Sequence, residues 1–193
     1  MARPGDVLRG GGKRLVFLET KADTNGARLS FDEFVEAGED AVPAHVHPRQ
    51  RELFTVVSGT LGVRVGGKER LVAAGEAVEV PPGAPHTYWN AGGSELHHVV
   101  TLEPALDHET FFESVYGLAR EGFSPQRKTL RNLMLLAQLF AGHDNWLAGV
   151  PVPLQRVLFP LLAALGRALG LKVWKPTYAA VGGEVSLNPP TLV

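Results

Sequence analysis

The sequence predicts a mainly β protein, an antiparallel sandwich or barrel, with a helical extension at its C-terminal end. In the first part of the chain, short runs of alternating apolar residues are separated by glycine- and proline-rich turns, with no helical pattern between them. Near residue 104 the composition changes, and beyond it leucine and alanine recur at helical spacing. We therefore expect a β domain over residues 1–104, followed by a helical extension and tail over residues 105–193 that packs on the barrel or at a dimer interface.

The β domain is expected to contain short strands joined by tight turns. The segments DTNG at 23–26 and PPGAP at 81–85 have typical turn composition and separate apolar runs. The glycines at 10–12 are expected to form a flexible entry, because their spacing matches no phosphate-binding loop. The predicted strands cover residues 14–20, 27–36, 42–47, 52–57, 61–65, 69–72, 77–80, 86–91 and 95–103.

The second part of the chain is expected to contain three helices, over residues 107–121, 125–141 and 151–169. Asp107 is a suitable N-cap for the first helix, and Pro160 should kink or interrupt the third. The leucines of the third helix form a broad apolar stripe, which could cover one end of the barrel, close the pocket mouth or pack against a second subunit. The tail from residue 172 onward is expected to be extended and irregular.

Composition and charge disfavour several classes of function. The chain has 19 lysines and arginines against 20 acidic residues, so it lacks the basic excess that nucleic-acid binding requires. It has no cysteine, which excludes disulfides, thiolate ligands and thiol catalysis. Its N-terminal apolar run is too short for a signal peptide, and its longest hydrophobic stretch, residues 157–165, is too short to span a membrane. We expect a cytoplasmic protein with neither a nucleic-acid nor a membrane partner.

A possible metal site begins with two histidines that are two positions apart. On a strand, His45 and His47 would point to the same face. Pro48 ends that strand, and an antiparallel neighbour can bring Glu52 beside the histidines, on a face that it shares with Phe54. Burying a bare carboxylate among apolar side chains is very costly, and a divalent cation would stabilise it.

A third imidazole comes from His86, which follows a proline- and glycine-rich corner and starts a returning strand. Three neutral imidazoles and one carboxylate suit one divalent transition ion per chain, with iron, manganese, nickel, copper and zinc all compatible. Either segment alone is weak evidence, because such pairs and corners are common in strands and turns. The two segments together, in this order and in an all-β pattern, favour a metal centre.

These two segments resemble the two motifs of the cupin superfamily. Residues 38–59 have the pattern G-x6-H-x-H-x4-E-x6-G, which is similar to the first cupin motif with one additional residue after the opening glycine. Residues 75–90 have the pattern G-x5-P-x-G-x2-H-x3-N, which matches the second motif throughout. The resemblance covers about residues 26–103. It implies an antiparallel jelly-roll (double-stranded β-helix) barrel, a metal bound inside it by the three histidines and the glutamate, and a homodimer.

Strand parity predicts which other side chains line the pocket. His98 shares an apolar face of its strand and is a candidate partner of a ligand or a general base, although a satisfied interior or rim histidine is the favoured interpretation. Glu33 falls on an otherwise apolar face, and its role is unassigned. His108 and His143 are expected at the surface. The predicted pocket-lining residues are Phe31, Phe54, Val56, Val63, Tyr88 and His98.

Three functions remain open. Four protein ligands leave open coordination positions, which favours a small-molecule oxidoreductase of the dioxygenase type, with Glu52 and His98 as candidate catalytic groups. A redox-inert ion that polarises a carbonyl would instead support an isomerase or hydrolase. The lack of an unambiguous acid–base group beyond the ligands would also suit a non-catalytic protein that binds or senses a small ligand in the barrel.

Overall fold

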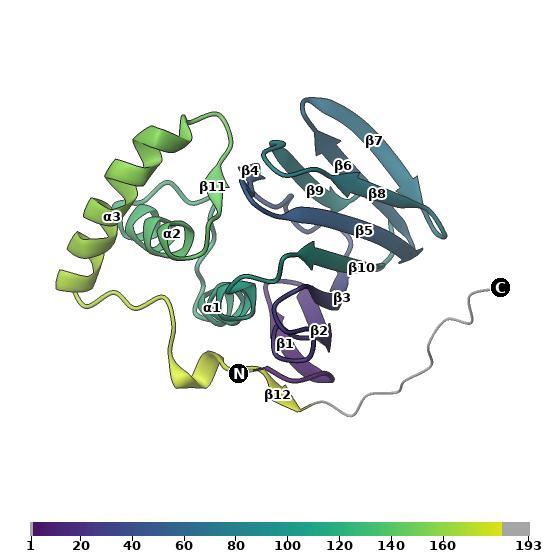
Figure 1. The fold of residues 1–193 in the computed structure, drawn as a ribbon, viewed down its shortest axis with the longest axis horizontal. Coiled ribbons are helices and arrows are strands. Elements are labelled where there is room, and N and C mark those ends of the chain that lie inside the picture. Colours follow the sequence, from purple (N-terminus) through teal and green to yellow (C-terminus); the bar gives the residue numbers. More distant parts are fainter. Residues whose placement is uncertain (1, 183–193) are drawn as a thin grey trace.

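The computed structural model of the chain describes residues 2–182 and consists of two antiparallel sheets with three helices beside them (Figure 1). Every strand pairing in both sheets is antiparallel, and the mainly β barrel followed by helices is confirmed. The larger sheet has the order β12-β1-β2-β3-β10-β5-β8. Its strands are β1 (Asp6–Gly10), β2 (Lys13–Glu19), β3 (Leu29–Val35), β5 (Arg51–Ser58), β8 (Ala77–Val80), β10 (Leu96–Glu103) and β12 (Val181–Gly182).

The smaller sheet has the order β11-β4-β9-β6-β7 and carries the turns on which the predicted metal site depends. Asn90 ties this sheet to the larger one, because its side-chain amide donates to the carbonyl of Val35 at 2.9 Å. The strands are β4 (His45–Val46), β6 (Thr60–Val65), β7 (Lys68–Ala73), β9 (His86–Asn90) and β11 (Trp146–Leu147).

The core between the sheets follows the alternation of the sequence. Along β10, every second side chain is buried, as expected for a strand with one face on the core. The predicted inward faces of β3, β5 and β6 are also buried, since Phe31, Phe54 and Val63 are at most 1% exposed. Strand parity therefore predicted the orientation of these side chains correctly.

The glycine run near the N-terminus is ordered rather than a flexible entry. Gly11 and Gly12 have φ angles of 59° and 63° and form the tight turn between β1 and β2. A two-residue turn of this kind requires positive φ at both positions, which glycine adopts at little cost. The prediction missed β1 because its sequence, DVLRG, has only two apolar side chains, Val7 and Leu8, which are adjacent and show no alternation.

The helices are α1 (His108–Arg120), α2 (Leu130–Gly142) and α3 (Val152–Ala168), with a short 3₁₀ helix at Pro176–Tyr178. Asp107 precedes α1 as predicted, although its side chain makes no capping hydrogen bond. The second helix begins five residues later than predicted, because the Thr129 hydroxyl accepts a hydrogen bond from the Asn132 amide at 3.1 Å and caps the helix there. Pro160 lies inside α3 without interrupting it, so of the two predicted effects the interruption is wrong and a kink stays a prediction.

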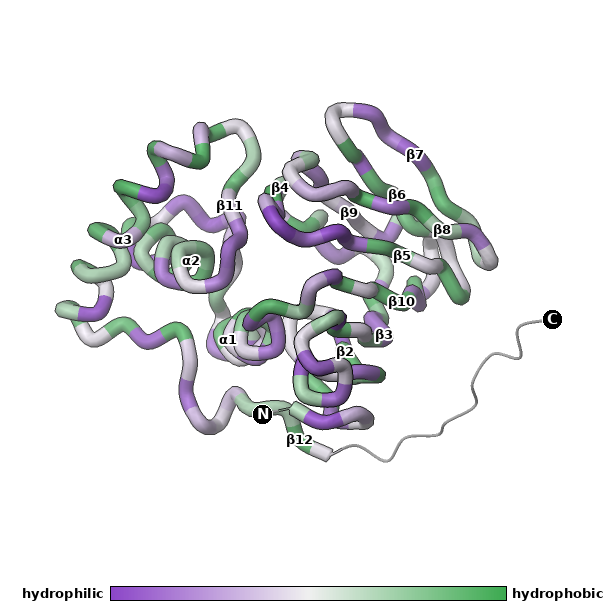
Figure 2. Tube along the Cα trace, viewed as in Figure 1, coloured by the Kyte–Doolittle hydropathy of each residue, from purple (hydrophilic) through white to green (hydrophobic). Residues whose placement is uncertain are grey.

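The apolar stripe of α3 faces away from the barrel. This helix packs on α2 through Phe159, Ala163 and Gly166, and hydrophobic positions recur along its whole length (Figure 2). The stripe therefore neither covers the barrel end nor closes a pocket, and a homodimer through this face stays a prediction. The exposed residues of the stripe are Leu154, Val157, Leu158, Leu161, Leu165 and Leu169.

The tail is more regular than predicted. After α3 the chain forms the 3₁₀ helix, and β12 then pairs with β1 through Val181 and Val7. The part of the predicted irregular tail beyond Gly182 lies outside the described residues.

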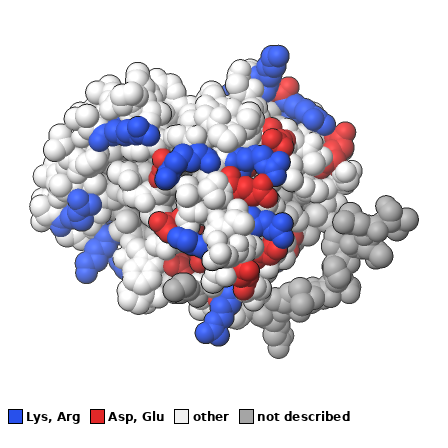
Figure 3. All heavy atoms as spheres, in the orientation of Figure 1, with Lys and Arg blue, Asp and Glu red and all other residues white. Residues whose placement is uncertain are grey.

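Charged side chains of both signs are interspersed on the surface (Figure 3). Arg51, for example, pairs with both Glu79 and Glu103 on the outer face of the larger sheet. Within residues 2–182, no helix combines the length and the apolar character that a bilayer crossing demands.

Gly117 lets the tail dock on α1, and replacing it should weaken the fold. A Cβ at this position would overlap the ring of Tyr178, so Gly117→Ala should lower the free energy of unfolding by about 1–3 kcal/mol through overpacking. Urea unfolding measures this loss. Gly142→Ala is the matched control, because a Cβ there meets open space and should leave stability unchanged or slightly higher. Equal stabilities of the two variants would contradict this account of the docking.

Candidate metal centre

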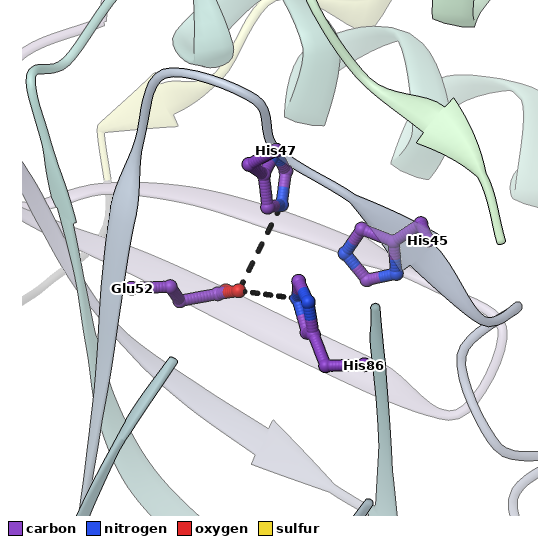
Figure 4. Close-up of side chains that lie close together, drawn as sticks. All are labelled: His45, His47, Glu52 and His86. Carbon is purple, nitrogen blue, oxygen red and sulfur yellow. Dashed lines mark ion pairs between the residues drawn. The ribbon is translucent and has the colours of Figure 1, made fainter. Parts of the chain in front are cut away.

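The three histidines and the glutamate predicted from the sequence lie together inside the barrel. One ligand atom from each of His45, His47, Glu52 and His86 lies within 4.8 Å of the others, and all four residues are buried. Their side chains point toward one another from separate strands and turns (Figure 4). The structure thus brings together every residue of the predicted ligand set.

Strand pairing explains this convergence. His45 on β4 lies directly opposite His86 on β9, so the two imidazoles are neighbours across the smaller sheet. The corner that precedes β9 is attached to the histidine pair, because the amide of Gly83 donates to the carbonyl of His47 at 2.9 Å. Gln50 holds the turn into β5, since its side-chain amide donates to the carbonyl of Pro104 at 2.8 Å. This turn brings the glutamate of the larger sheet under the histidines of the smaller one.

Backbone carbonyls orient two of the imidazoles. The Nδ1 atom of His45 lies 2.8 Å from the carbonyl oxygen of Pro43, and that of His86 lies 3.0 Å from the carbonyl oxygen of Ala84. Because a carbonyl oxygen can only accept, Nδ1 must donate in both rings, and the neutral ring keeps its lone pair on Nε2. The Nε2 atoms are therefore the available donor atoms for an ion.

The atoms that face the centre lack ordinary hydrogen bonds. Glu52 Oε2 lies 2.8 Å from His86 Nε2 and 3.7 Å from His47 Nε2 (Figure 4). Neither contact has the geometry of a hydrogen bond, so Glu52 Oε2 and His86 Nε2 are buried without a hydrogen-bond partner among the described residues. Buried polar atoms normally have partners, and a divalent ion at the common point would provide one. The donor set fits a transition metal.

The protonation of two of the three imidazoles also suits an ion. Burial lowers the pKa of His45 well below its ordinary value, and the nearby His86 and His47 lower it further. The pKa of His47 is lowered well below its ordinary value in the same way, first by burial and then by His108 and His86. Burial would also lower the pKa of His86, but the Glu52 carboxylate outweighs it and leaves this pKa raised. His45 and His47 are therefore neutral at physiological pH, in the form that binds metal.

A cavity of about 150 Å³ adjoins three of the four residues. His45, His47 and Glu52 form part of its wall, and Lys13 is the only lysine or arginine among the described lining residues. The rest of the wall is mostly apolar and comes from α1 and α2. Its main side chains are Phe111, Phe112, Val115, Leu136, Leu139 and Phe140.

Only one of the six predicted pocket-lining residues lies on the wall of this cavity, namely Tyr88. Phe31, Phe54, Val56, Val63 and His98 point inward as expected, but they are buried in the core of the barrel and do not line the cavity. The reason is that side chains fill the barrel interior, whereas the cavity lies between the barrel and the helices. Period-two alternation separates inward from outward faces and cannot separate a packed core from a cavity wall.

His98 does not lie on the cavity wall, so it is not placed as a general base toward a substrate. Its Nε2 atom is 3.2 Å from Glu33 Oε2, in a contact that lacks hydrogen-bond geometry, and its side chain is fully buried. It therefore lies behind Glu33 as an interior histidine.

His108 was predicted to lie at the surface, but it is buried. It is the first residue of α1, it lines the cavity, and its ring centroid is 5.2 Å from that of His47. Neither ring nitrogen has a hydrogen-bond partner among the described residues. Burial, followed by the proximity of His143 and His45, lowers the pKa of His108 to about 3. His143 is half-buried, with Nδ1 donating to the carbonyl of Leu139 at 2.8 Å.

A second polar group on the cavity wall is centred on Glu33. Its carboxylate accepts hydrogen bonds from the hydroxyls of Tyr88 at 2.8 Å and Tyr116 at 2.9 Å. Burial would raise the pKa of Glu33, but His98, the charge of Lys13 and the Tyr88 hydroxyl outweigh it and hold this pKa at about 2. The signal for Glu33 was present in the sequence as an acid on an apolar face. Nothing in the sequence identified Tyr116, which α1 brings to it.

Comparisons with known proteins agree with this architecture. The family model described as "Cupin domain" matches residues 32–102. A protein named as an oxidoreductase in Arthrobotrys oligospora is 30% identical over 114 residues, which cover 55% of this chain and 44% of that protein. Oxalate oxidase 1 of Hordeum vulgare is 32% identical over 88 residues, which cover 42% of this chain and 43% of that protein. The chain thus spans about half the length of these curated relatives, or less.

Two solved structures are similar to part of the chain. A crystal structure of an RmlC-like cupin from Shewanella frigidimarina is 22% identical, covers 55% of this chain and 90% of its own, and gives a TM-score of 0.46. A cupin-like protein from Thermotoga maritima is 23% identical, covers 54% of this chain and 80% of its own, and gives a TM-score of 0.44. These two similarities carry no information about the function of this chain.

The pKa of Glu33 predicts how stability depends on pH. Because it is depressed from 4.5 to about 2, the ionised carboxylate stabilises the folded state above pH 4.5, and this stabilisation is lost as the pH falls from 4.5 toward 2. The loss would be roughly 3 kcal/mol at most, at about 1.4 kcal/mol per pKa unit. Urea unfolding between pH 7 and pH 3 should therefore show a steeper decline for the native chain than for Glu33→Gln. The exposed Glu95→Gln should keep the native slope, and equal slopes for all three proteins would rule out this role of Glu33.

Proposed function

We propose that the chain, whose β barrel matches the cupin-domain model and places it in the cupin superfamily, is a metal-dependent oxidoreductase of the dioxygenase type. In this proposal His45, His47, Glu52 and His86 bind one divalent transition ion. The observation that carries it is the convergence of these four buried side chains on one point, where Glu52 Oε2 and His86 Nε2 lack hydrogen-bond partners within residues 2–182. The oxidoreductase names of the relatives from Arthrobotrys oligospora and Hordeum vulgare support the reaction class.

A redox-active ion at this position would supply the electron transfer between an organic substrate and dioxygen. The protein's own groups have separate tasks. The apolar wall from α1 and α2 excludes water from the reacting atoms, which strengthens every polar interaction in the cavity. Glu52 lines the cavity, so its carboxylate is placed to accept a proton from a substrate hydroxyl. In this proposal His108, which is neutral and has no hydrogen-bond partner in the described part of the chain, would bond a second polar atom of the substrate.

The cavity itself argues against a small dianion such as oxalate as the substrate. Glu33 and Glu52 both line it, and Lys13 is the only lysine or arginine among the described lining residues. With a divalent ion bound, the ion, Lys13, Glu33 and Glu52 together leave about one positive charge, so a dianion would stay incompletely balanced in a mostly apolar cavity, and burying unbalanced charge is costly. We therefore propose a mostly apolar substrate that carries at least one oxygen able to approach the metal.

Metal binding is the first test of this proposal. Elemental analysis of the purified 193-residue chain should find about one divalent transition ion per chain. His86→Ala should lower the affinity for that ion at least tenfold, because one ligand and its fixed Nε2 lone pair are removed. The control is His97→Ala, since His97 contacts Asp32 on the other face of β10 and should keep full metal content. A chain that binds no ion after saturation, or equal affinities in both variants, would contradict the metal centre.

Oxygen consumption tests the reaction class. Chain loaded separately with iron, copper, manganese or nickel is mixed with small enols and catechols, and dissolved oxygen is followed with an electrode. A dioxygenase should consume oxygen and place both atoms of labelled dioxygen in the product, whereas hydrogen peroxide as the product would identify an oxidase. Turnover without oxygen would favour an isomerase or hydrolase. Binding of these compounds without turnover under any condition would favour a non-catalytic ligand-binding protein.

A further inference from the structure

The size of the cavity limits what it can bind. A volume of about 150 Å³ is the size of an apolar cavity that accommodates a single benzene ring. The wall opposite the barrel is made of flat and branched apolar side chains, including Phe111, Phe112, Leu136 and Phe140. Aromatic rings prefer such surroundings, where they stack or pack edge to face. Size and lining together indicate one aromatic ring rather than a sugar or a fused ring system.

The polar group of Glu33, Tyr88 and Tyr116 is the second feature of this cavity, and all three residues line it. Each tyrosine hydroxyl donates its only proton to Glu33, which leaves the lone pairs of both hydroxyl oxygens available. The carboxylate also keeps acceptor capacity, because an ionised carboxylate has about four acceptor sites. This wall is therefore rich in acceptors and would favour a ligand that donates a hydrogen bond.

Lys13 adds a donor next to these acceptors. Its Nζ atom lies 5.5 Å from the centroid of the Tyr88 ring, and it forms no ion pair with a described carboxylate. A hydroxyl group can donate to Glu33 or to a tyrosine oxygen and accept from Lys13 at the same time. An ammonium group could only donate, and a carboxylate could only accept. The combination favours a hydroxyl group on the ring.

We propose that the cavity binds single-ring phenols, with the apolar side chains of α1 and α2 around the ring and the phenolic hydroxyl bound by Glu33, Tyr88, Tyr116 and Lys13. This names the substrate class of the proposed oxidoreductase, on which its catalytic meaning rests, and such a substrate would carry a second oxygen that can approach the metal. Binding of the hydroxyl involves none of the four metal ligands, so it can be measured with or without the ion.

The test compares two probes that differ only in the hydroxyl group, 4-fluorophenol and fluorobenzene. Fluorine NMR measures the affinity of each for the 193-residue chain as purified and again after chelation of its metal. A hydrogen bond to a charged group strengthens binding about tenfold or more, so 4-fluorophenol should bind at least about tenfold more tightly than fluorobenzene in both preparations. Similar affinities for the two probes, or no binding of either, would overturn the proposal.

Two variants locate the hydroxyl. Tyr116→Phe removes one hydroxyl and keeps the ring, and Glu33→Gln removes the charge and keeps the shape. Each should reduce the preference for 4-fluorophenol to threefold or less while the affinity for fluorobenzene stays within twofold. Tyr178→Phe is the matched control, because it removes a buried hydroxyl that does not line the cavity, and its preference should stay native. Urea unfolding checks that each variant is folded, and if Glu33→Gln is not, Tyr116→Phe decides the outcome.

The two proposals fail in different ways. If the chain binds no metal and consumes no oxygen, but prefers 4-fluorophenol through Tyr116, the phenol site stands and the oxidoreductase proposal falls. If the chain binds metal and consumes oxygen, but Tyr116→Phe keeps the native preference for 4-fluorophenol, the phenol site falls and the metal proposal stands.

Discussion

Two carboxylates buried in an apolar interior are the constraint on which the rest of this site depends. An ionised carboxylate leaves water only if hydrogen bonds or a cation replace its hydration. Glu33 meets this requirement within the chain, through the hydroxyls of Tyr88 and Tyr116. Glu52 does not, because its Oε2 atom faces His86 and His47 without a hydrogen bond. The carboxylate of Glu33 is therefore stabilised by hydrogen bonds from the chain itself, whereas that of Glu52 would be stabilised by a bound cation.

Both parts of the chain are needed to make this cavity. The barrel supplies the four candidate ligands through the pairing of β4 with β9 and the turn into β5. The helices supply the apolar wall and also His108 and Tyr116. The two parts are joined at the site itself, because β11 pairs with β4 and places Leu147 opposite His45. A change in helix packing would thus reach a ligand strand directly through backbone hydrogen bonds.

The barrel and the ligand set could be predicted from the sequence because both follow from local spacing. Residues two apart on a strand share a face, so His45 and His47 had to be neighbours, and Glu52 had to join them after a short turn. His108 and Tyr116 could not be predicted in this way, because their position depends on where α1 docks. Helical periodicity identifies the apolar face of a helix, but it does not say which part of a distant barrel that face will cover. The start of α2 was missed for a local reason. The sequence suggested a start at Pro125, but the Thr129 hydroxyl caps the helix and α2 begins at Leu130.

The similarity between this chain and the cupin domain covers the barrel and does not extend to the helices. The matched segment, residues 32–102, contains all four candidate ligands together with Glu33 and Tyr88. Tyr116, His108 and the apolar wall of α1 and α2 lie outside it. A resemblance confined to the barrel therefore bears on how an ion is held, whereas the choice of molecule that approaches the ion depends on helices to which the family match does not extend. Two chains with the same four ligands would accept different substrates if the side chains packed over the barrel differed in size or polarity, so here substrate class has to be argued from the cavity wall rather than from a relative's name.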